Sequence, residues 1–389
     1  MSLMPPPLAI LAELTHRCPL RCPYCSNPVA LIRSGEELST GEWVDLLRQA
    51  AALGVLQVHL SGGEPTARKD LEEIVAVARE LGIYTNLITS AVLLDRARVE
   101  ALAAVGLDHV QISFQDSEAA AADRIGGHAG GHEKKRAVAA WVRAASLPLT
   151  VNLVVHRQNL DHLGAMIEMA AAMDARRIEV AHVQYYGWGL ANRAALMPTR
   201  EQVAAADVVV AEARARLEGR AVIDYVVPDY YARRPKPCMG GWGRQFLTVT
   251  PAGKVLPCHA ADSIPGLVFD SIRERPLADI WEHSEAFRRF RGTDWMAEPC
   301  RSCDRREIDW GGCRCQAFAL AGDAAATDPA CGLSPRHAEI AALAEQDSRA
   351  GEAEFLYRSF ATVEAARARR AGPPSDRERR EAAATPGPG

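Results

Sequence analysis

Three cysteines lie close together near the start of the chain, in the sequence Cys18-Pro-Leu-Arg-Cys22-Pro-Tyr-Cys25. Thiolates are ligands of iron-sulfur clusters and of zinc. A four-iron cluster usually takes four protein ligands, so three neighbouring cysteines would leave one iron open to another molecule. The alternative is a zinc site completed by His16 or by a distant residue. The spacing alone therefore predicts a metal centre of one of these two kinds.

A second motif, Ser61-Gly62-Gly63-Glu64-Pro65, follows a short β-prone run at residues 58–60. Glycines let another backbone or a ligand come close, and a carboxylate such as that of Glu64 pairs well with an ammonium group. Taken alone, the motif is equally typical of an ordinary turn. Its meaning depends on whether the fold brings it to the first three cysteines.

The other seven cysteines all lie between residues 238 and 331. Ten cysteines in a chain without a secretory signal favour metal binding over disulfides. The pair Cys300-x2-Cys303 is also compatible with a zinc ribbon. If an aspartate within this region is counted, eight candidate ligands are present, enough for two clusters. They are Cys238, Cys258, Cys300, Cys303, Asp309, Cys313, Cys315 and Cys331.

Short apolar runs alternate with alanine-rich helical patterns through the first half of the chain. We predict strands at residues 8–14, 58–60, 83–88, 109–114, 149–155 and 178–183. We predict helices at residues 42–53, 70–81, 97–105, 133–145, 160–173 and 200–218. This alternation indicates an α/β fold with a parallel sheet covered by helices, and six units favour a partial (β/α)6 TIM-like barrel. Barrels carry their chemistry at the carboxyl ends of the strands, so both motifs are expected at the same end.

The pattern changes after residue 223 to short segments rich in Pro, Gly, Trp and Cys. We predict a barrel domain over residues 1–223 and a small Cys-rich domain over residues 224–335, where bound metal replaces part of an apolar core. A helical segment is expected at residues 336–370. The charged, Pro- and Gly-rich stretch 371–389 has no apolar face and is predicted to be a disordered tail.

The composition excludes several classes of protein. With 389 residues, 48% hydrophobic and 24% charged, the chain is typical of a globular protein. No run approaches the roughly 18 apolar residues of a membrane span, and a net charge of -4 gives no general reason to expect nucleic-acid binding. The amino terminus lacks the features of a secretory signal, which predicts a cytoplasmic protein.

The Cys-x3-Cys-x2-Cys spacing, with Tyr24 between the last two cysteines, resembles the cluster loop of the radical S-adenosylmethionine (SAM) superfamily. The resemblance implies a 4Fe-4S cluster held by Cys18, Cys22 and Cys25, whose open iron binds the amino and carboxylate groups of SAM. Reductive cleavage of SAM would then release a 5'-deoxyadenosyl radical. The Gly-Gly-Glu-Pro segment would lie beside the methionine end of SAM. The cofactor-binding residues expected on this basis, together with their location at strand ends, are Tyr24, Gly62, Gly63, Glu64, Ser113, Gln115 and Asn152.

The second cysteine region resembles the SPASM domain, which carries auxiliary clusters in radical SAM enzymes that act on peptides. The family pattern has a cysteine at the position of Asp309, and a carboxylate would make one iron of that cluster different from the others. The resemblance implies two auxiliary clusters, each of the 2Fe-2S or 4Fe-4S type, and groups Cys300, Cys303, Asp309 and Cys331 around one of them. It groups Cys238, Cys258, Cys313 and Cys315 around the other.

Asp309, the segment Ile-Ser-Phe-Gln-Asp at residues 112–116 and Val-Gln-Tyr-Tyr-Gly-Trp at residues 183–188 resemble one branch of this superfamily. That branch is the PqqA peptide cyclases of pyrroloquinoline quinone (PQQ) biosynthesis. It implies the precursor peptide PqqA as substrate, the chaperone PqqD and an electron donor such as flavodoxin as partners, and a carbon-carbon bond between a Glu γ-carbon and a Tyr ring. No catalytic base is assigned from the sequence.

Two other functions remain open at this point. The chain resembles other SPASM peptide maturases as well, which form thioether bonds or oxidise a sulfatase side chain. A noncatalytic, metal-stabilised binding protein is the alternative from a different class, and it predicts zinc or no open-iron cluster and no cleavage of SAM.

Overall fold

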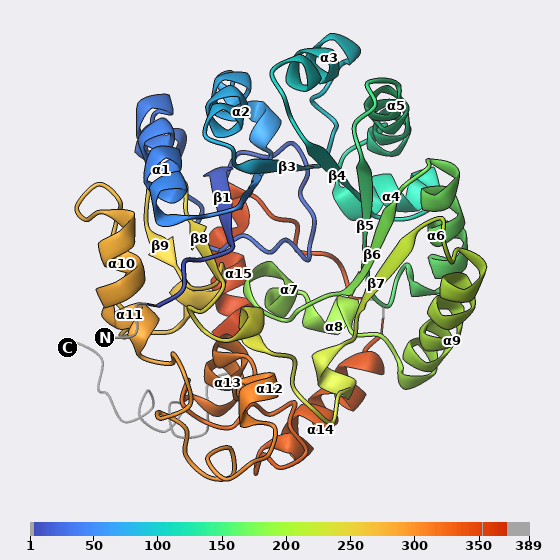
Figure 1. Cartoon of the computed structure of the whole chain (residues 1–389). Coiled ribbons are helices and arrows are strands. Elements are labelled where there is room, and N and C mark those ends of the chain that lie inside the picture. The colour runs from blue at the N-terminus through green and yellow to red at the C-terminus, as the bar shows by residue number, and fades with distance from the viewer. Residues whose placement is uncertain (1–3, 352, 372–389) are drawn as a thin grey trace, which may run out of the picture.

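The computed structural model describes residues 4–351 and 353–371, and a nine-stranded sheet organises them (Figure 1). The strands are β1 (Ala9–Thr15), β2 (Gln57–Gly62), β3 (Tyr84–Thr89), β4 (His109–Phe114), β5 (Leu149–Val155), β6 (Arg177–His182), β7 (Val222–Val226), β8 (Phe246–Val249) and β9 (Val255–Leu256). Their order across the sheet is β7-β6-β5-β4-β3-β2-β1-β8-β9. All neighbouring pairs are parallel except the last, β8 with β9.

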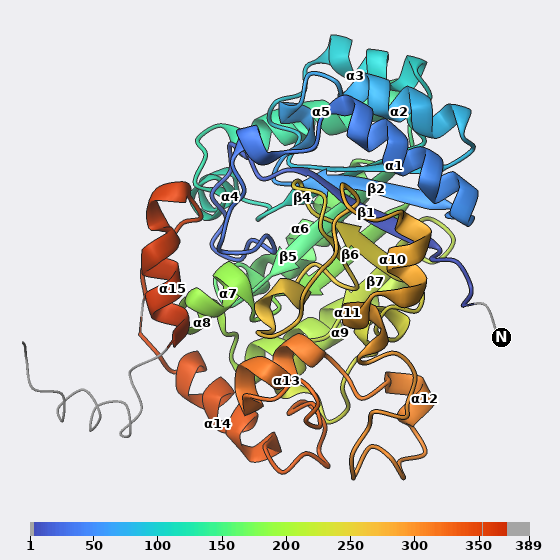
Figure 2. The same cartoon turned by 90° about the vertical axis from the view of Figure 1, so that its left-hand side faces the viewer.

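Helices cover the outer face of this curved sheet, as both views show (Figures 1 and 2). The covering helices are α1 (Thr40–Leu53), α2 (Leu71–Glu80), α3 (Arg96–Ala104), α5 (Gly131–Ala144), α6 (Leu163–Ala172) and α9 (Arg200–Arg216). The short helices α4 (Ala119–Gly126), α7 (Gly187–Ala191) and α8 (Arg193–Leu196) lie toward the carboxyl ends of the strands (Figure 2). Local signals explain where some of the covering helices begin: Ser39 and Glu42 form a capping box at the start of α1, and Thr199 and Gln202 do so for α9. The core between sheet and helices is almost wholly aliphatic.

The structure confirms the six strands and six helices that the sequence predicts for the barrel, with ends shifted by a few residues. It also adds strands that we did not predict. One is β7, which extends the parallel sheet beyond β6, and another is β8, which pairs with β1 on the opposite side. Residues 8 and 83, predicted as strand starts, lie just before β1 and β3. The partial α/β barrel is therefore correct, and its sheet is wider than six strands.

The Cys-rich region is joined to the barrel more closely than the sequence suggests. The boundary predicted after residue 223 falls inside β7, so we propose to place it after Val226. Beyond it, β8 continues the barrel sheet by pairing in parallel with β1. The helices of this region are short: α10 (Leu277–His283), α11 (Glu285–Arg288), α12 (Arg306–Asp309) and α13 (Arg314–Ala321).

The carboxyl-terminal segment differs from the continuous helix expected over residues 336–370. It forms two separate helices, α14 (His337–Ser348) and α15 (Val363–Ala371), and the short 3-10 helix η7 (Phe360–Thr362) directly precedes the second. Helix α15 packs against α7 beside the barrel (Figure 2). The first residue of the predicted tail, 371, ends α15, and residues 372–389 lie outside the described part of the chain. Across the described ranges, we find no helix whose length and apolar character would let it span a bilayer.

Candidate cofactor and iron-sulfur sites

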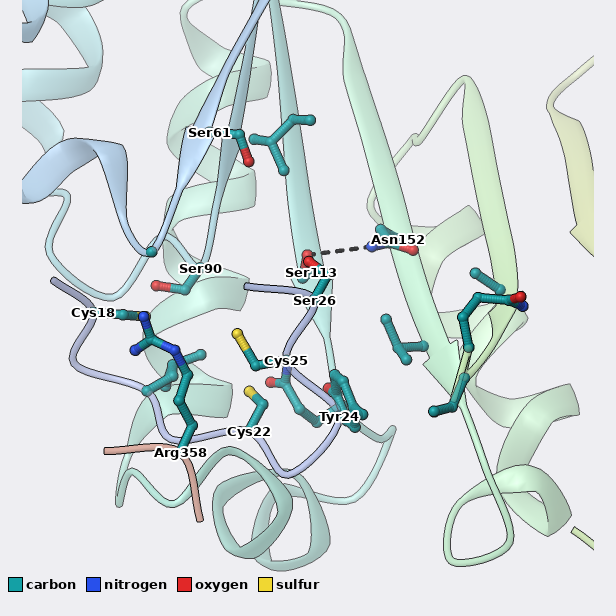
Figure 3. Close-up of a pocket in the computed structure, with 18 of the residues that line it drawn as sticks. Cys18, Cys22, Tyr24, Cys25, Ser26, Ser61, Ser90, Ser113, Asn152 and Arg358 are labelled. Atoms are coloured by element: carbon teal, nitrogen blue, oxygen red, sulfur yellow. Dashed lines mark hydrogen bonds between the residues drawn. The ribbon is translucent and has the colours of Figure 1, made fainter. Parts of the chain in front are cut away.

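A cavity of about 340 Å³ opens at the carboxyl ends of the barrel strands. Cys18, Cys22 and Cys25 line it, carried by the loop that follows β1, and Figure 3 shows these three side chains gathered at one side of the cavity. Six of the seven predicted cofactor residues line it too: Tyr24, Gly62, Gly63, Ser113, Gln115 and Asn152. The strand ends thus bring together motifs that are far apart in the sequence.

Several buried polar atoms at this cavity have no partner within the protein. They include the hydroxyl of Tyr24 and Oδ1 of Asn152, whose amide Nδ2 donates to Oγ of Ser113 at 3.4 Å. Buried polar groups are usually hydrogen-bonded, so atoms of this kind are suited to a polar ligand. The donor set of three thiols and neutral hydrogen-bonding groups fits an iron-sulfur cluster together with SAM.

Burial disfavours the thiolate form of two of these cysteines, Cys18 and Cys22. Burial raises the pKa of Cys22 to about 11, although the ammonium group of Lys135 opposes this shift. Burial also raises the pKa of Cys18, and the nearby carboxylate of Glu64 adds to the effect. Since thiolates are the ligand form, these cysteines need positive charge close to their sulfur atoms, which iron would supply.

Lys135 is itself buried beneath the cavity. Its Nζ donates to the backbone oxygen of Ser113 at 3.0 Å and to Oε1 of Gln115, and burial lowers its pKa to about 8. The lysine therefore fixes the end of β4 and the side chain of Gln115, and its charge lies near Cys22.

Gly62 and Gly63 are required by close backbone contact with the strand that leads to the cluster loop. A Cβ atom on Gly63 would lie 2.4 Å from the backbone oxygen of Arg17, and one on Gly62 would lie 2.4 Å from that of Thr15. The backbone NH of Glu64 donates to the oxygen of Arg17 at 2.8 Å. The two motifs are therefore held directly against each other.

We expect Gly63→Ala to lower both the stability of the protein and its affinity for SAM. The added methyl group cannot fit without moving the backbone at Arg17, and forced overpacking costs roughly 1–3 kcal/mol. Thermal unfolding and equilibrium binding of SAM to the reconstituted protein measure the two effects. Gly35→Ala is the matched control, because a Cβ at Gly35 meets nothing within 4 Å. Wild-type behaviour of Gly63→Ala would contradict the packing described here.

The predicted contact between Glu64 and the cofactor stays a prediction, since in this structure the Glu64 side chain is fully buried and does not line the cavity. Its carboxylate accepts hydrogen bonds from the hydroxyls of Thr66 and Thr89, both at 2.6 Å, and from the backbone NH of Ser90 at 2.7 Å. A carboxylate so well supplied with donors has a structural role. It positions Ser90, which does line the cavity.

His16 does not complete a zinc site with the first three cysteines. Its Nδ1 accepts a hydrogen bond from the backbone NH of Ile32 at 2.9 Å, and its Nε2 lies 3.4 Å from the carboxylate of Glu13. Both ring nitrogens are therefore engaged elsewhere. In the described residues, no three His, Cys, Asp or Glu side chains converge on the position of a single metal ion. Thiolates that hold a cluster need not converge in this way, because each binds its own iron.

The cavity is also lined by His182, Gln184 and Tyr186, which belong to the segment 182–192 that the sequence predicts as part of a substrate cavity. Ser61, the first residue of the Ser-Gly-Gly-Glu-Pro motif, lines it too. Sequence reasoning missed Ser26, Ser90 and Arg358. Arg358 belongs to the segment before α15, and no local pattern near it signals a role in a cofactor site.

Four cysteines of the second region form one neighbouring group. The thiol of Cys238 interacts with those of Cys258 and Cys313, and the thiol of Cys315 interacts with the same two. All four cysteines are free, and three of them are buried. The structure thus brings together the set that the resemblance assigned to one auxiliary cluster.

The remaining candidate ligands line a separate small cavity. Cys300, Cys303, Asp309 and Cys331 all contribute to it. Asp309 is buried, its Oδ1 accepts a hydrogen bond from the backbone NH of Gly311 at 3.2 Å, and its Oδ2 lies 3.4 Å from Nε of Arg305. The loop and the arginine therefore hold the carboxylate beside the three thiols, as a ligand set would require.

The Tyr186 side chain lies between the large cavity and the group of four cysteines. Its ring lines the cavity, and its hydroxyl is hydrogen-bonded to Nε2 of His259, the residue that follows Cys258. The thiols of Cys258, Cys313, Cys315 and Cys25 all act on its pKa, which burial raises well above the usual value for tyrosine. Tyr186 is thus close both to Cys25 of the first motif and to the group that contains Cys258, Cys313 and Cys315.

Comparison with known families agrees with this geometry. The model of the radical SAM superfamily matches residues 12–170, and that of the SPASM iron-sulfur cluster-binding domain matches residues 238–304. A curated protein of Rhodopseudomonas palustris, named PqqA peptide cyclase, is 65% identical over 92% of this chain and 96% of its own length. A protein of the same name from Granulibacter bethesdensis is 62% identical over 87% of this chain and 90% of its own.

The chain belongs to the PqqA peptide cyclase family. It is a radical SAM enzyme with a SPASM domain, and it binds SAM and iron-sulfur clusters. The noncatalytic binding protein considered from the sequence is therefore excluded.

Solved structures support the fold alone. Streptococcus suis SuiB bound to precursor peptide SuiA is 19% identical, with a TM-score of 0.68 over 81% of this chain and 74% of its own. Native anSMEcpe with bound AdoMet is 15% identical, with a TM-score of 0.61 over 88% of this chain and 96% of its own.

Proposed function

We propose that the enzyme joins a Glu γ-carbon to a Tyr ring carbon within the precursor peptide PqqA, an early step of PQQ biosynthesis. The observation that carries this proposal is identity of 60–65% with curated PqqA peptide cyclases over about nine-tenths of the chain. A thioether-forming or sulfatase-maturing activity has weaker support, because the curated relatives at 60–65% identity are named PqqA peptide cyclase.

The residues of the cavity fit the cofactors that this reaction needs. Cys18, Cys22 and Cys25 would hold a 4Fe-4S cluster, and Tyr24, Ser113, Gln115 and Asn152 would contact SAM. When bound, these groups supply a 5'-deoxyadenosyl radical that removes a hydrogen atom from the peptide. The cavity walls orient SAM and the peptide and exclude water, which would otherwise compete for the radical site.

The auxiliary clusters would accept the electron that bond formation releases. After the carbon radical adds to the ring, one electron and one proton must leave before the ring is aromatic again. We propose that Cys238, Cys258, Cys313 and Cys315 hold the cluster nearer to the substrate, because Tyr186 touches both the cavity and the neighbour of Cys258. Cys300, Cys303, Asp309 and Cys331 would hold a second auxiliary cluster, of the 2Fe-2S or 4Fe-4S type like the first.

Two protein partners complete the proposal. The chaperone PqqD would deliver the peptide, and an electron donor such as flavodoxin would reduce the cluster at Cys18, Cys22 and Cys25. Both follow from membership of the family.

An anaerobic reaction of the reconstituted enzyme with SAM, reductant, PqqA and PqqD tests the function. We expect a peptide that has lost two hydrogen atoms and resists fragmentation between its Glu and Tyr residues, because the new bond keeps the two ends together. Fragment-resolved mass spectrometry detects this product. Deoxyadenosine formed beside unchanged PqqA would retain the radical chemistry and reject the substrate.

A further inference from the structure

The segment at residues 355–359, here called the C-terminal strap, runs along the loop that carries the first three cysteines. Asn192 holds it in place, since its Oδ1 accepts from the backbone NH of Leu356 at 2.7 Å and its Nδ2 donates to the oxygen of Leu356 at 3.0 Å. The same amide donates to the oxygen of Pro23 in the cluster loop at 2.9 Å. The backbone NH of Arg358 donates to the oxygen of Arg21 at 3.1 Å. The strap is therefore part of the cluster site.

Arg358 extends from the strap into the cavity. Figure 3 shows its guanidinium beside Cys18 and close to Cys22 and Ser90. The residue is only 4% exposed. Its Nη2 donates to the backbone oxygen of His16 at 2.6 Å and to Oδ1 of Asn27 at 3.3 Å, whereas its Nε is buried without a partner. The side chain is thus fixed in direction and still has a free donor.

The charge of Arg358 lies near the thiols of Cys18 and Cys22, whose pKa it lowers, and it is paired with no carboxylate in the described part of the protein. No carboxylate of those residues lies within ion-pair distance of its guanidinium. The nearby carboxylate of Glu64 is occupied by Thr66, Thr89 and Ser90. Burying an unpaired charge is costly unless a ligand of opposite charge compensates it. The site is therefore built for an anion.

The location of Arg358 indicates which anionic ligand its guanidinium would bind. It is the one lysine or arginine among the described residues that line the cavity, and it lies on the side of the cysteines. In a radical SAM enzyme, the amino acid end of SAM lies at the cluster. Guanidinium groups bind carboxylates through parallel hydrogen bonds of well-defined geometry. We propose that Arg358 binds the carboxylate of the methionine end of SAM, a contact that rests on the assignment of Cys18, Cys22 and Cys25 to the SAM-binding cluster.

Equilibrium binding to the oxidised holoenzyme, in which SAM is not cleaved, tests this proposal. The probes are SAM and decarboxylated SAM, which lacks the carboxylate. We expect Arg358→Gln to weaken SAM binding about 10- to 100-fold, as for loss of a charged hydrogen-bonded contact. Binding of decarboxylated SAM should change less than about threefold. Arg358→Lys keeps the charge and loses the paired donors, so it should lie between wild type and Arg358→Gln.

Arg21→Gln is the matched control, because the exposed Arg21 side chain stacks over Tyr357 of the strap and does not line the cavity. It should leave the affinity for SAM unchanged. Iron content and thermal unfolding check each variant. If Arg358→Gln loses its cluster, the test rests on Arg358→Lys. Wild-type affinity of the Arg358→Lys variant for SAM would then overturn the proposal.

Other outcomes also overturn it. Equal weakening of both probes would assign Arg358 a structural role. Unchanged SAM binding with weaker binding of PqqA would assign its charge to a carboxylate of the peptide. The result is independent of the proposed substrate, because SAM binding is measured without peptide. An enzyme that does not cyclise PqqA could still depend on Arg358.

Discussion

Cys22→Ala is expected to abolish the reductive cleavage of SAM. The substitution removes one of the three ligands proposed for the cluster, and among the described residues that line the cavity no fourth cysteine could replace it. We expect the rate to fall at least about a thousandfold, equivalent to roughly 4 kcal/mol in the activation barrier. Formation of 5'-deoxyadenosine in the presence of dithionite and absence of peptide measures this rate.

Cys303→Ala is the control, because it also removes a cysteine but one outside the first cluster loop. Cys303 lines the separate small cavity in the SPASM domain. It should retain most SAM cleavage in the absence of peptide. Wild-type cleavage by Cys22→Ala, with the same iron content as the wild-type enzyme, would refute the assignment of the first three cysteines.

Cys258→Ala should separate cleavage of SAM from formation of the crosslinked peptide. Cys258 lies between Cys238 and Cys315, and its neighbour His259 is hydrogen-bonded to Tyr186 at the cavity. Loss of this ligand removes the proposed electron acceptor and leaves the first cluster loop intact. We expect crosslinked PqqA to fall at least about a hundredfold, while SAM cleavage without peptide falls less than about tenfold. Mass spectrometry of the peptide and assay of deoxyadenosine give the two rates.

Asp309→Cys provides the contrasting variant. It replaces a carboxylate ligand by a thiolate ligand in the auxiliary group that contains Cys300, Cys303 and Cys331. It should keep a full set of ligands and retain more crosslinking than Cys258→Ala. Crosslinking at the wild-type rate in Cys258→Ala would contradict the proposed electron path. Equal loss of both rates would instead show that the substitution damages the barrel.

The barrel and the location of the cysteine motifs could be predicted because they depend on local patterns. Apolar runs such as residues 109–114 and 149–155 are buried in a parallel sheet and appear in the structure with unchanged bounds. The seventh strand, β7, could not be predicted in this way. Its sequence, Val-Ile-Asp-Tyr-Val, is short and mixed, and pairing with β6 determines its conformation.

The physical role of a residue was harder to predict than its place at the site. Gly62 and Gly63 were expected to let another backbone or a ligand come close, and the close contact that requires them is with the backbone of residues 14–17 of this chain. Glu64 was expected to face the cavity, but hydroxyl donors from β3 and the loop after it hold the carboxylate away. Its direction depends on side chains distant in sequence, which periodicity does not reveal.

The hydrogen bond from Arg358 to His16 has a consequence for the order of events during synthesis. These residues are separated by 342 positions, so at about 5–20 residues per second the ribosome needs roughly 20 to 70 s to produce the second after the first. The cysteines of the first cluster loop therefore emerge long before the strap that completes the wall beside them. A cluster inserted into the growing chain would lie open to solvent and oxygen on that side. Insertion after release would avoid this exposure, because the strap can fold onto the cluster loop only after residue 358 has been made.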